Sequence, residues 1–262
     1  MNFVERGCDM TIPLQKGLIY GPVNSRRLGR SLGINLLPLK LKICTFNCVY
    51  CQYGWTNVHG DQLPDASLWP GLSDIGATLE SALRELPTPP SYLTFSGNGE
   101  PTLHPYFPEI VKEVIRLRNH YIPAAKLAIL SNSSTVCRPP IRKALEELDV
   151  RIMKLDCGDE ICFRKYNNPA RGINLTDIVN GLMETCDVTI QSLFTAGEGG
   201  NSSVNHLRAW IEQIRKIEPV MVQLYTLDRG YPSDEIYPVS REHLEEIKHD
   251  LDAMNILSNV YF

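Results

Sequence analysis

The fold is decided by the stretch Tyr92-Leu93-Thr94-Phe95-Ser96-Gly97-Asn98-Gly99 and by the apolar helical pattern that follows it. The first four residues are typical of a short buried strand, and the glycine-rich end is typical of a turn where that strand stops. Isoleucine, valine and leucine then recur between positions 110 and 117 at helical spacing, and Pro108 suits the first turn of that helix. The stretch therefore predicts one strand-then-helix unit.

The same alternation repeats along most of the chain. Further strand-like segments occupy residues 31–36, 126–130, 150–155, 188–194 and 220–227. Helical patterns occupy residues 72–86, 140–148, 178–182, 207–217 and 244–251, and Ser240 is the candidate N-cap of the last one. With the central unit, the pattern predicts six strand-then-helix units.

Helical crossovers between consecutive strands require a parallel sheet with right-handed connections. Six units are two short of a closed eight-unit barrel, so we expect an α/β protein with a partial, six-unit (β/α)6 barrel. A doubly wound sheet is the alternative. Residues 1–30 are expected to form an N-terminal arm and residues 31–262 the barrel domain. In both architectures the chemistry belongs at the carboxyl ends of the strands.

Composition limits the class of protein. Of 262 residues, 43% are hydrophobic and 21% are charged, which suits a packed core and excludes a long disordered chain. Lys and Arg total 26 against 30 Asp and Glu, and the resulting net charge of -4 argues against a protein that coats nucleic acid. No apolar run approaches the roughly 18 residues of a membrane span, and residues 1–17 lack a signal-peptide core. We therefore expect a cytoplasmic protein without a membrane partner, whose eight cysteines are reduced rather than paired in disulfides.

Three of the cysteines lie close together in Cys44-Thr45-Phe46-Asn47-Cys48-Val49-Tyr50-Cys51. Three thiolates on one short loop can converge on a metal cluster, and no fourth cysteine lies nearby in the sequence. Structural zinc sites and 4Fe–4S clusters both normally take four protein ligands. With three, one iron of a 4Fe–4S cluster is left open for an exogenous ligand, which is expected for chemistry at the cluster. A zinc loop and three ordinary thiols remain the alternatives.

The Cys-x-x-x-Cys-x-x-Cys spacing, with the aromatic Tyr50 before its last cysteine, resembles the motif of the radical S-adenosylmethionine (radical SAM) superfamily. The resemblance implies a 4Fe–4S cluster on Cys44, Cys48 and Cys51, whose open iron is chelated by S-adenosylmethionine. One electron from the cluster then gives methionine and a 5′-deoxyadenosyl radical, which abstracts hydrogen from a substrate. It also implies a six-unit partial barrel and an electron donor such as a flavodoxin or a ferredoxin.

The resemblance extends to the ends of the second and third strands. The segment Ser96, Gly97, Asn98, Gly99 and Glu100 is similar to the family's Gly-Gly-Glu motif, which receives the methionine ammonium, although Asn98 separates the two glycines here. Ser131 and Asn132 are similar to the family's ribose-binding position. An ordinary turn is the alternative at both places.

Later strand ends supply further candidates for cofactor or substrate contacts. They are Asp156, Gln191, Ser192, Tyr225, Leu227, Asp228 and Arg229, and Tyr50 of the cysteine motif is a further candidate for a cofactor contact. Gln191 and Tyr225 interrupt apolar strands, and an inward polar side chain costs stability unless it has a partner. Because alternate residues of a strand face opposite sides of a sheet, these side chains cannot all point into one site.

Residues 21–33 and 222–229, together with the segment from Ser96 to Pro105, resemble more narrowly a subgroup of radical SAM oxidoreductases related to the wyosine-base synthases of tRNA. That subgroup's synthases hold a second cluster on N-terminal cysteines, whereas this chain has only Cys8 there. They also use a lysine that forms a Schiff base with pyruvate, for which Lys154 is the candidate; a structural lysine is the alternative. The arginines at 26, 27 and 30 suit either an anionic ligand or ion pairs that tie the arm to the barrel.

Cys157 and Cys162 follow the fourth strand and, with Cys8, are candidates for an auxiliary cluster. The sequence as a whole predicts a radical SAM enzyme that acts on a small molecule or a peptide. The alternatives are modification of a tRNA base, which the acidic charge balance disfavours, and a non-catalytic zinc or iron–sulfur binding protein.

Overall fold

The computed structural model describes residues 11–60 and 63–262, so Cys8 lies outside the described residues. Its central feature is an eight-stranded sheet in the order β1-β2-β5-β6-β7-β8-β10-β12. The strands are β1 (Ile19–Ser25), β2 (Gly29–Ile34), β3 (Ile43–Cys44), β4 (Val58–His59), β5 (Tyr92–Phe95), β6 (Lys126–Ser131), β7 (Val150–Lys154), β8 (Val188–Leu193), β9 (Thr195–Ala196), β10 (Met221–Tyr225), β11 (Tyr237–Pro238) and β12 (Ser258–Tyr261).

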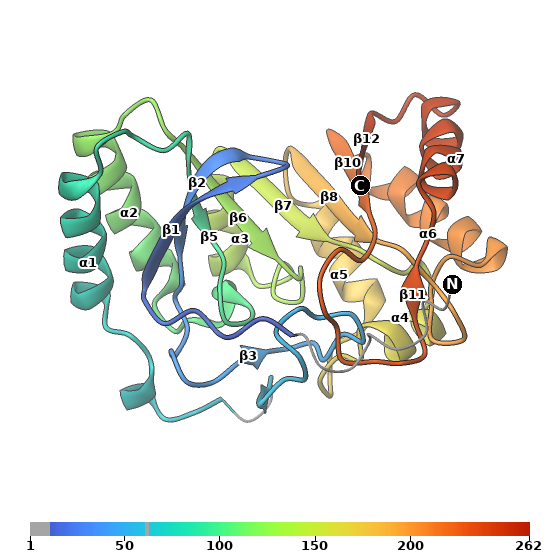
Figure 1. Cartoon of the computed structure of the whole chain (residues 1–262), viewed down its shortest axis with the longest axis horizontal. Helices are drawn as coiled ribbons and strands as arrows, with labels where there is room; N and C mark the ends of the chain where they lie inside the picture. Colours follow the sequence, from blue (N-terminus) through green and yellow to red (C-terminus); the bar gives the residue numbers. More distant parts are fainter. Residues whose placement is uncertain (1–10, 61–62) are drawn as a thin grey trace, which may run out of the picture.

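Seven helices accompany the sheet in the described part of the chain: α1 (Leu72–Glu85), α2 (Phe107–Tyr121), α3 (Pro139–Glu146), α4 (Glu160–Tyr166), α5 (Leu175–Met183), α6 (Val204–Ile217) and α7 (Arg241–Asp252). Two short 3-10 turns, Ala66–Leu68 and Pro101–Leu103, lie in the loops. Figure 1 shows the sheet curled into a half barrel, with the helices around its outside and the β3 loop at one end. None of the described helices has the length and apolar character needed to cross a bilayer.

The sheet contains two strands more than the sequence predicts. Every pair from β2 to β12 is parallel, and each of the six expected strands is present. The additional β12 follows α7 and pairs with β10, and β1 pairs antiparallel with β2. Both lie at edges: β1 carries Gly21 and Pro22, which read as loop residues but are tolerated in an edge strand. The count of six strands is therefore corrected to eight, and the α/β half-barrel class stands.

Helix ends follow the expected signals. Ser240 accepts a hydrogen bond from the backbone N–H of His243 (3.1 Å) and so caps α7. Pro108 lies in the first turn of α2, where its missing N–H costs nothing. Phe107 of the same turn is fully buried against Phe95 of β5, with ring centroids 5.9 Å apart. Packing of this kind fixes each strand's carboxyl end relative to the helix that follows it.

The loop that carries the three cysteines is bound to the end of β5 by backbone hydrogen bonds. Ile43 donates its N–H to the carbonyl of Asn98 (3.0 Å) and accepts from the N–H of Glu100 (3.0 Å). Gly99, at φ +136°, lies between them, and a Cβ there would meet the Ile43 carbonyl oxygen at 1.8 Å. A Cβ at Gly97 would meet Asn35 at 2.4 Å. Both positions therefore require glycine, because atoms of Ile43 and Asn35 occupy the space that a side chain would need.

The connection after β7 is packed equally tightly against α6. A Cβ at Gly158 would lie 2.0 Å from the carbonyl carbon of Ala209 and 2.1 Å from the nitrogen of Trp210. The buried indole of Trp210 donates to the carbonyl of Leu155 (2.9 Å) and to the hydroxyl of Ser192 (3.1 Å). This packing fixes the β7 end beside the β8 end.

We expect Gly158→Ala to lower the free energy of unfolding by about 1–3 kcal/mol, because the added methyl group has no space beside α6. Gly76→Ala is the matched control: its Cβ would meet only the flexible side chain of Glu113, at 3.3 Å, in the interior of α1. That change should be neutral or stabilising by up to about 1 kcal/mol. Urea unfolding of both variants measures the difference, and an unchanged Gly158→Ala midpoint would contradict the packing argument.

Candidate functional site

A cavity of about 570 Å³ opens at the carboxyl ends of the strands. It is lined by fifteen of the eighteen site residues expected from the sequence: Cys44, Cys48, Tyr50, Cys51, Ser96, Gly97, Gly99, Glu100, Ser131, Asn132, Gln191, Tyr225, Leu227, Asp228 and Arg229. These residues come from the cysteine loop and from the ends of β5, β6, β8 and β10. The fold therefore brings together side chains that lie up to 185 positions apart in the sequence.

The three cysteine sulfurs lie on the wall of this cavity, each in a different degree of burial. Cys44 and Cys48 are buried, and Cys51 is partly exposed. The Cys44 sulfur accepts hydrogen bonds from the N–H of Phe46 (3.4 Å) and from Nδ2 of Asn132 (3.4 Å). The Cys48 sulfur accepts from Nδ2 of Asn167 (3.5 Å). N–H donors aimed at sulfur suit thiolates, as in iron–sulfur sites, where such bonds tune the cluster.

Burial disfavours the charged form of these thiols. It raises the pKa of Cys44 to about 12 and that of Cys48 to about 11, although Lys42 acts in the opposite direction on Cys44. A positively charged metal group would supply the charge that makes them thiolates. The cavity lining contains neither a histidine nor a fourth cysteine within the described residues.

The donor set of the cavity fits a cluster with one open iron. A structural zinc site is closed by four protein ligands, whereas the described lining of the cavity offers three cysteines and no histidine. A 4Fe–4S cluster that is held by three cysteines keeps one iron open for an exogenous ligand. The cysteines present therefore fit such a cluster.

Glu100, which follows β5, links the end of that strand to Ser131 and Asn132 at the end of β6. Its Oε1 accepts from the backbone N–H of Thr102 (3.1 Å), the hydroxyl of Thr102 (2.6 Å) and the hydroxyl of Ser131 (3.0 Å). Its Oε2 accepts from the N–H of Asn132 (2.6 Å). Burial raises the pKa of Glu100, and these donors oppose that rise. Oε1 is saturated, whereas Oε2 keeps a lone pair for a ligand.

Three of the expected site residues do not line the cavity. Ser192 is fully buried, and its hydroxyl accepts from the indole of Trp210 (3.1 Å). Asn98 is fully buried, and its amide holds the backbone of Gln15 through both Oδ1 (2.7 Å) and Nδ2 (3.1 Å). Asp156 lies behind the wall and accepts from the hydroxyl of Tyr50 and from Nδ2 of Asn167 (2.7 Å). Asp156 therefore orients two side chains that border Cys48 instead of facing the cavity.

Lys154 lies in the cavity wall within a chain of polar side chains. Its Nζ donates to the hydroxyl of Tyr225 (3.0 Å) and lies 3.6 Å from Oδ1 of Asp156. The Tyr225 hydroxyl in turn donates to Oε1 of Gln191 (3.2 Å). Burial alone would lower the pKa of Lys154, but Asp156 and Tyr225 raise it above its usual value. The geometry holds Lys154 as an ammonium group.

The rim of the cavity is basic. Arg26 forms an ion pair with Asp228, so this arginine ties the N-terminal strand to the loop after β10. Arg27 lies over the ring of Tyr225, 4.9 Å from its centroid, and Arg229 donates to Gln52 (2.8 Å). Arg30 lies away from the cavity and donates to the carbonyl of Thr88 (3.2 Å).

Several cavity residues were not expected from the sequence. Gln15 and Tyr20 precede the first expected strand, and Lys42 and Tyr53 flank the cysteine motif. Gln15 donates to the hydroxyl of Tyr53 (3.0 Å), which closes one side of the cavity. The polar residues of a segment without periodicity carry no signal of such a role.

Cys157 and Cys162 form a disulfide, with Cα atoms 5.7 Å apart. This corrects two expectations: that all cysteines are reduced thiols, and that these two are free ligands for an auxiliary cluster. The third proposed ligand, Cys8, lies outside the described residues. Cys137 and Cys186 are exposed and unpaired with any described residue.

Solved structures with similar folds are radical SAM enzymes. A radical SAM methyltransferase from Sphaerobacter thermophilus superimposes with a TM-score of 0.61 at 14% identity, covering 88% of this chain and 65% of that one. TYW1 with a lysine-pyruvate adduct bound gives 0.59 at 16% identity, covering 86% and 73%. SuiB of Streptococcus suis bound to S-adenosylmethionine gives 0.61 at 13% identity, covering 88% and 50%. At these identities the likeness establishes the fold.

No protein-family model matches the chain. Curated relatives do match it over most of its length. A UPF0026 protein of Helicobacter pylori is 32% identical over 216 residues, which are 81% of this chain and 67% of the relative. A UPF0026 protein of Synechocystis sp. is 32% identical over 231 residues, 82% of this chain and 77% of the relative. The chain belongs to the UPF0026 protein family.

Proposed function

We propose that this protein is a radical SAM enzyme: Cys44, Cys48 and Cys51 hold a 4Fe–4S cluster, and S-adenosylmethionine binds beside it in the cavity. One observation carries the proposal: buried thiols with N–H donors at their sulfurs share a cavity with the Glu100 carboxylate and its strand-end partners. Held by these cysteines, the cluster would supply one electron for the reductive cleavage of S-adenosylmethionine to methionine and a 5′-deoxyadenosyl radical, the species that would abstract hydrogen from the substrate.

The chain's own residues bind and orient the cofactor. The free lone pair of Glu100 Oε2 would accept from the methionine ammonium, and Ser131 and Asn132 lie beside it and would hold the ribose. Gly97 and Gly99 line the same cavity with backbone, because Asn35 and Ile43 fill the space that side chains there would need. Lys154, Gln191 and Tyr225 form a further polar part of the lining.

The substrate enters past a basic rim. Arg27 and Arg229 leave positive charge at the cavity mouth, which suits a small molecule or a peptide with an anionic group. SuiB, whose fold is similar, has been solved bound to a precursor peptide. A flavodoxin or ferredoxin is the proposed electron donor, and a reducing cytoplasm is the proposed compartment, since the cluster is oxygen-sensitive.

Modification of a tRNA base remains the second candidate, supported by the fold likeness to TYW1 and by the arginine rim. Two features weigh against its pyruvate-dependent form. Lys154 is held by Asp156 and Tyr225 as an ammonium group, which has no lone pair for attack on a carbonyl. The net charge of -4 also disfavours a nucleic-acid substrate. The zinc-protein alternative is disfavoured because the described cavity lining offers three cysteines and no histidine, one ligand short of a structural zinc site.

Cys48→Ala should abolish both cluster assembly and cleavage of S-adenosylmethionine, because the cluster loses one of its three ligands. Anaerobic reconstitution with iron and sulfide, followed by a count of iron and by chromatography of 5′-deoxyadenosine under dithionite, measures both. Cys137→Ala, at an exposed free cysteine, is the matched control and should behave as the parent protein. Deoxyadenosine formation that survives in Cys48→Ala would refute the assignment.

Lys154 should give no Schiff base with pyruvate, because its lone pair is protonated in the ion pair with Asp156. Incubation with pyruvate and cyanoborohydride, followed by peptide mass spectrometry, should leave the Lys154 peptide unchanged. A mass increase on that peptide which Lys154→Arg eliminates would instead favour the wyosine-synthase type of chemistry.

A further inference from the structure

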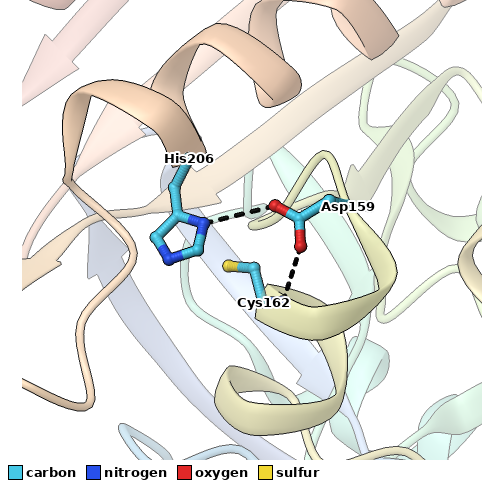
Figure 2. A group of neighbouring side chains, drawn as sticks. All are labelled: Asp159, Cys162 and His206. Atoms are coloured by element: carbon cyan, nitrogen blue, oxygen red, sulfur yellow. Dashed lines mark hydrogen bonds and ion pairs between the residues drawn. The ribbon is translucent and has the colours of Figure 1, made fainter.

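Outside the cavity, one group of side chains has the composition of a metal site. Asp159, Cys162 and His206 each offer one ligand atom, and these atoms lie within 4.8 Å of one another. Figure 2 shows the three converging from different elements: Asp159 and Cys162 from the start of α4, and His206 from the start of α6. None of the three lines the cavity.

Local structure holds each of these side chains in place. Asp159 is the N-cap of α4, and its Oδ1 accepts from the N–H of Cys162 (2.8 Å). Its Oδ2 lies 3.2 Å from Nδ1 of His206. Ser203 caps α6 and so fixes the turn that carries His206. The site is therefore preorganised by two helix caps.

The ligand atoms suit zinc. Zn²⁺ takes thiolate sulfur, imidazole nitrogen and carboxylate oxygen in one tetrahedral shell, with bonds of about 2.0–2.3 Å. A contraction of the present spacing would satisfy those bonds. The carboxylate and the imidazole are about one third exposed, at 36% and 32%, so an ion can reach them from solvent, whereas Cys162 is buried.

A fourth candidate ligand, Cys157, is covalently bonded to Cys162. The sulfur of Cys162 is in a disulfide with Cys157, which is also buried. A sulfur in a disulfide carries no thiolate charge and is a poor zinc ligand. Reduction would free the Cys162 sulfur, which lies within 4.8 Å of the ligand atoms of Asp159 and His206, and would leave the Cys157 sulfur next to it.

We propose that this cluster is a redox-controlled zinc site. A dithiol reductant donates two electrons and two protons to the Cys157–Cys162 disulfide, which gives two thiols and leaves the reductant as a disulfide. Zn²⁺ then displaces the two thiol protons to solvent and binds Cys157, Cys162, His206 and Asp159. Oxidation by a disulfide of higher potential reverses the exchange and releases the ion.

The segment that carries this candidate zinc site also contacts the cysteine loop of the cavity. Asp156 stands next to Cys157 in the chain, and Asn167 follows α4. Both contact the cysteine loop: Asp156 through Tyr50, and Asn167 through the Cys48 sulfur. The disulfide and the zinc ion are thus two alternative clamps on one segment.

The test uses the full chain with its iron–sulfur cluster reconstituted anaerobically, so that the cavity cysteines are occupied. One sample is reduced with tris(carboxyethyl)phosphine and another is kept as the disulfide. Each is equilibrated with Zn²⁺ against a weak chelator, and zinc and iron per chain are counted by mass spectrometry. We expect one zinc more per chain in the reduced sample.

His206→Ala and Asp159→Asn should each weaken this zinc binding by at least about tenfold, since even an outer partner of a ligand is worth 10–100-fold. Asn keeps the helix cap, so Asp159→Asn separates ligation from folding. His243→Ala is the matched control. His243 also follows a serine cap, and its Nδ1 lies 3.3 Å from the carboxylate of Glu246. Among the described residues, however, no cysteine forms a group with metal-ligand spacing around this pair.

Cys157→Ser should bind zinc without prior reduction, more weakly than the reduced parent, because Cys162 is then permanently free. Three results would overturn the proposal: equal zinc in the reduced and oxidised samples, retention in His206→Ala, or equal loss in His243→Ala. Iron content and deoxyadenosine formation are recorded on the same samples. If only the iron content or the deoxyadenosine formation is lost, that result bears on the cluster proposed in the cavity, and the zinc counts still test the zinc site.

Discussion

The cavity depends on a short backbone ladder between Ile43 and the end of β5. Two hydrogen bonds, to Asn98 and from Glu100, fix the cysteine loop directly over that strand end. Gly99 allows the approach, because any side chain there would collide with the Ile43 carbonyl. With the loop anchored, Cys44 comes within reach of the Asn132 amide, and Asn132 is itself fixed by Glu100. One main-chain contact thus sets the distance between the sulfurs and the carboxylate.

The pattern of apolar residues predicted the inner strands of the sheet and missed its two edge strands, β1 and β12. Central strands such as β6 and β8 are buried over most of their length and bounded by turn residues, and both lie where the pattern placed them. β1 carries proline and glycine, and β12 follows the last helix as only four residues, Ser258–Tyr261. An edge strand needs partners on one side alone, so its sequence is less constrained, and periodicity detects it poorly.

The site residues show a similar division. Most of the residues that were chosen by residue type and by position after a strand do line the cavity, because parallel strands end at one edge of the sheet. The sequence did not predict in which direction each side chain points. Asp156 follows the end of a strand, yet its carboxylate lies behind the cavity wall and contacts Tyr50. Asn98 lies within the glycine motif but serves the chain before the barrel. Which side of a loop a side chain faces depends on tertiary contacts that local sequence does not encode. The Cys157–Cys162 disulfide is a further case, since the compartment argued against it.

The tie between Gln15 and Asn98 spans 83 positions, and it forms one side of the cavity. Contacts of such long separation carry a large loop-closure cost and tend to form after the local strand-and-helix units. We therefore expect the half barrel to consolidate first and residues 11–18 to dock late. Such an order would leave the cysteine loop open on the side that residues 11–18 later cover. A cluster would then have a wider path to its ligands before this segment docks than after it.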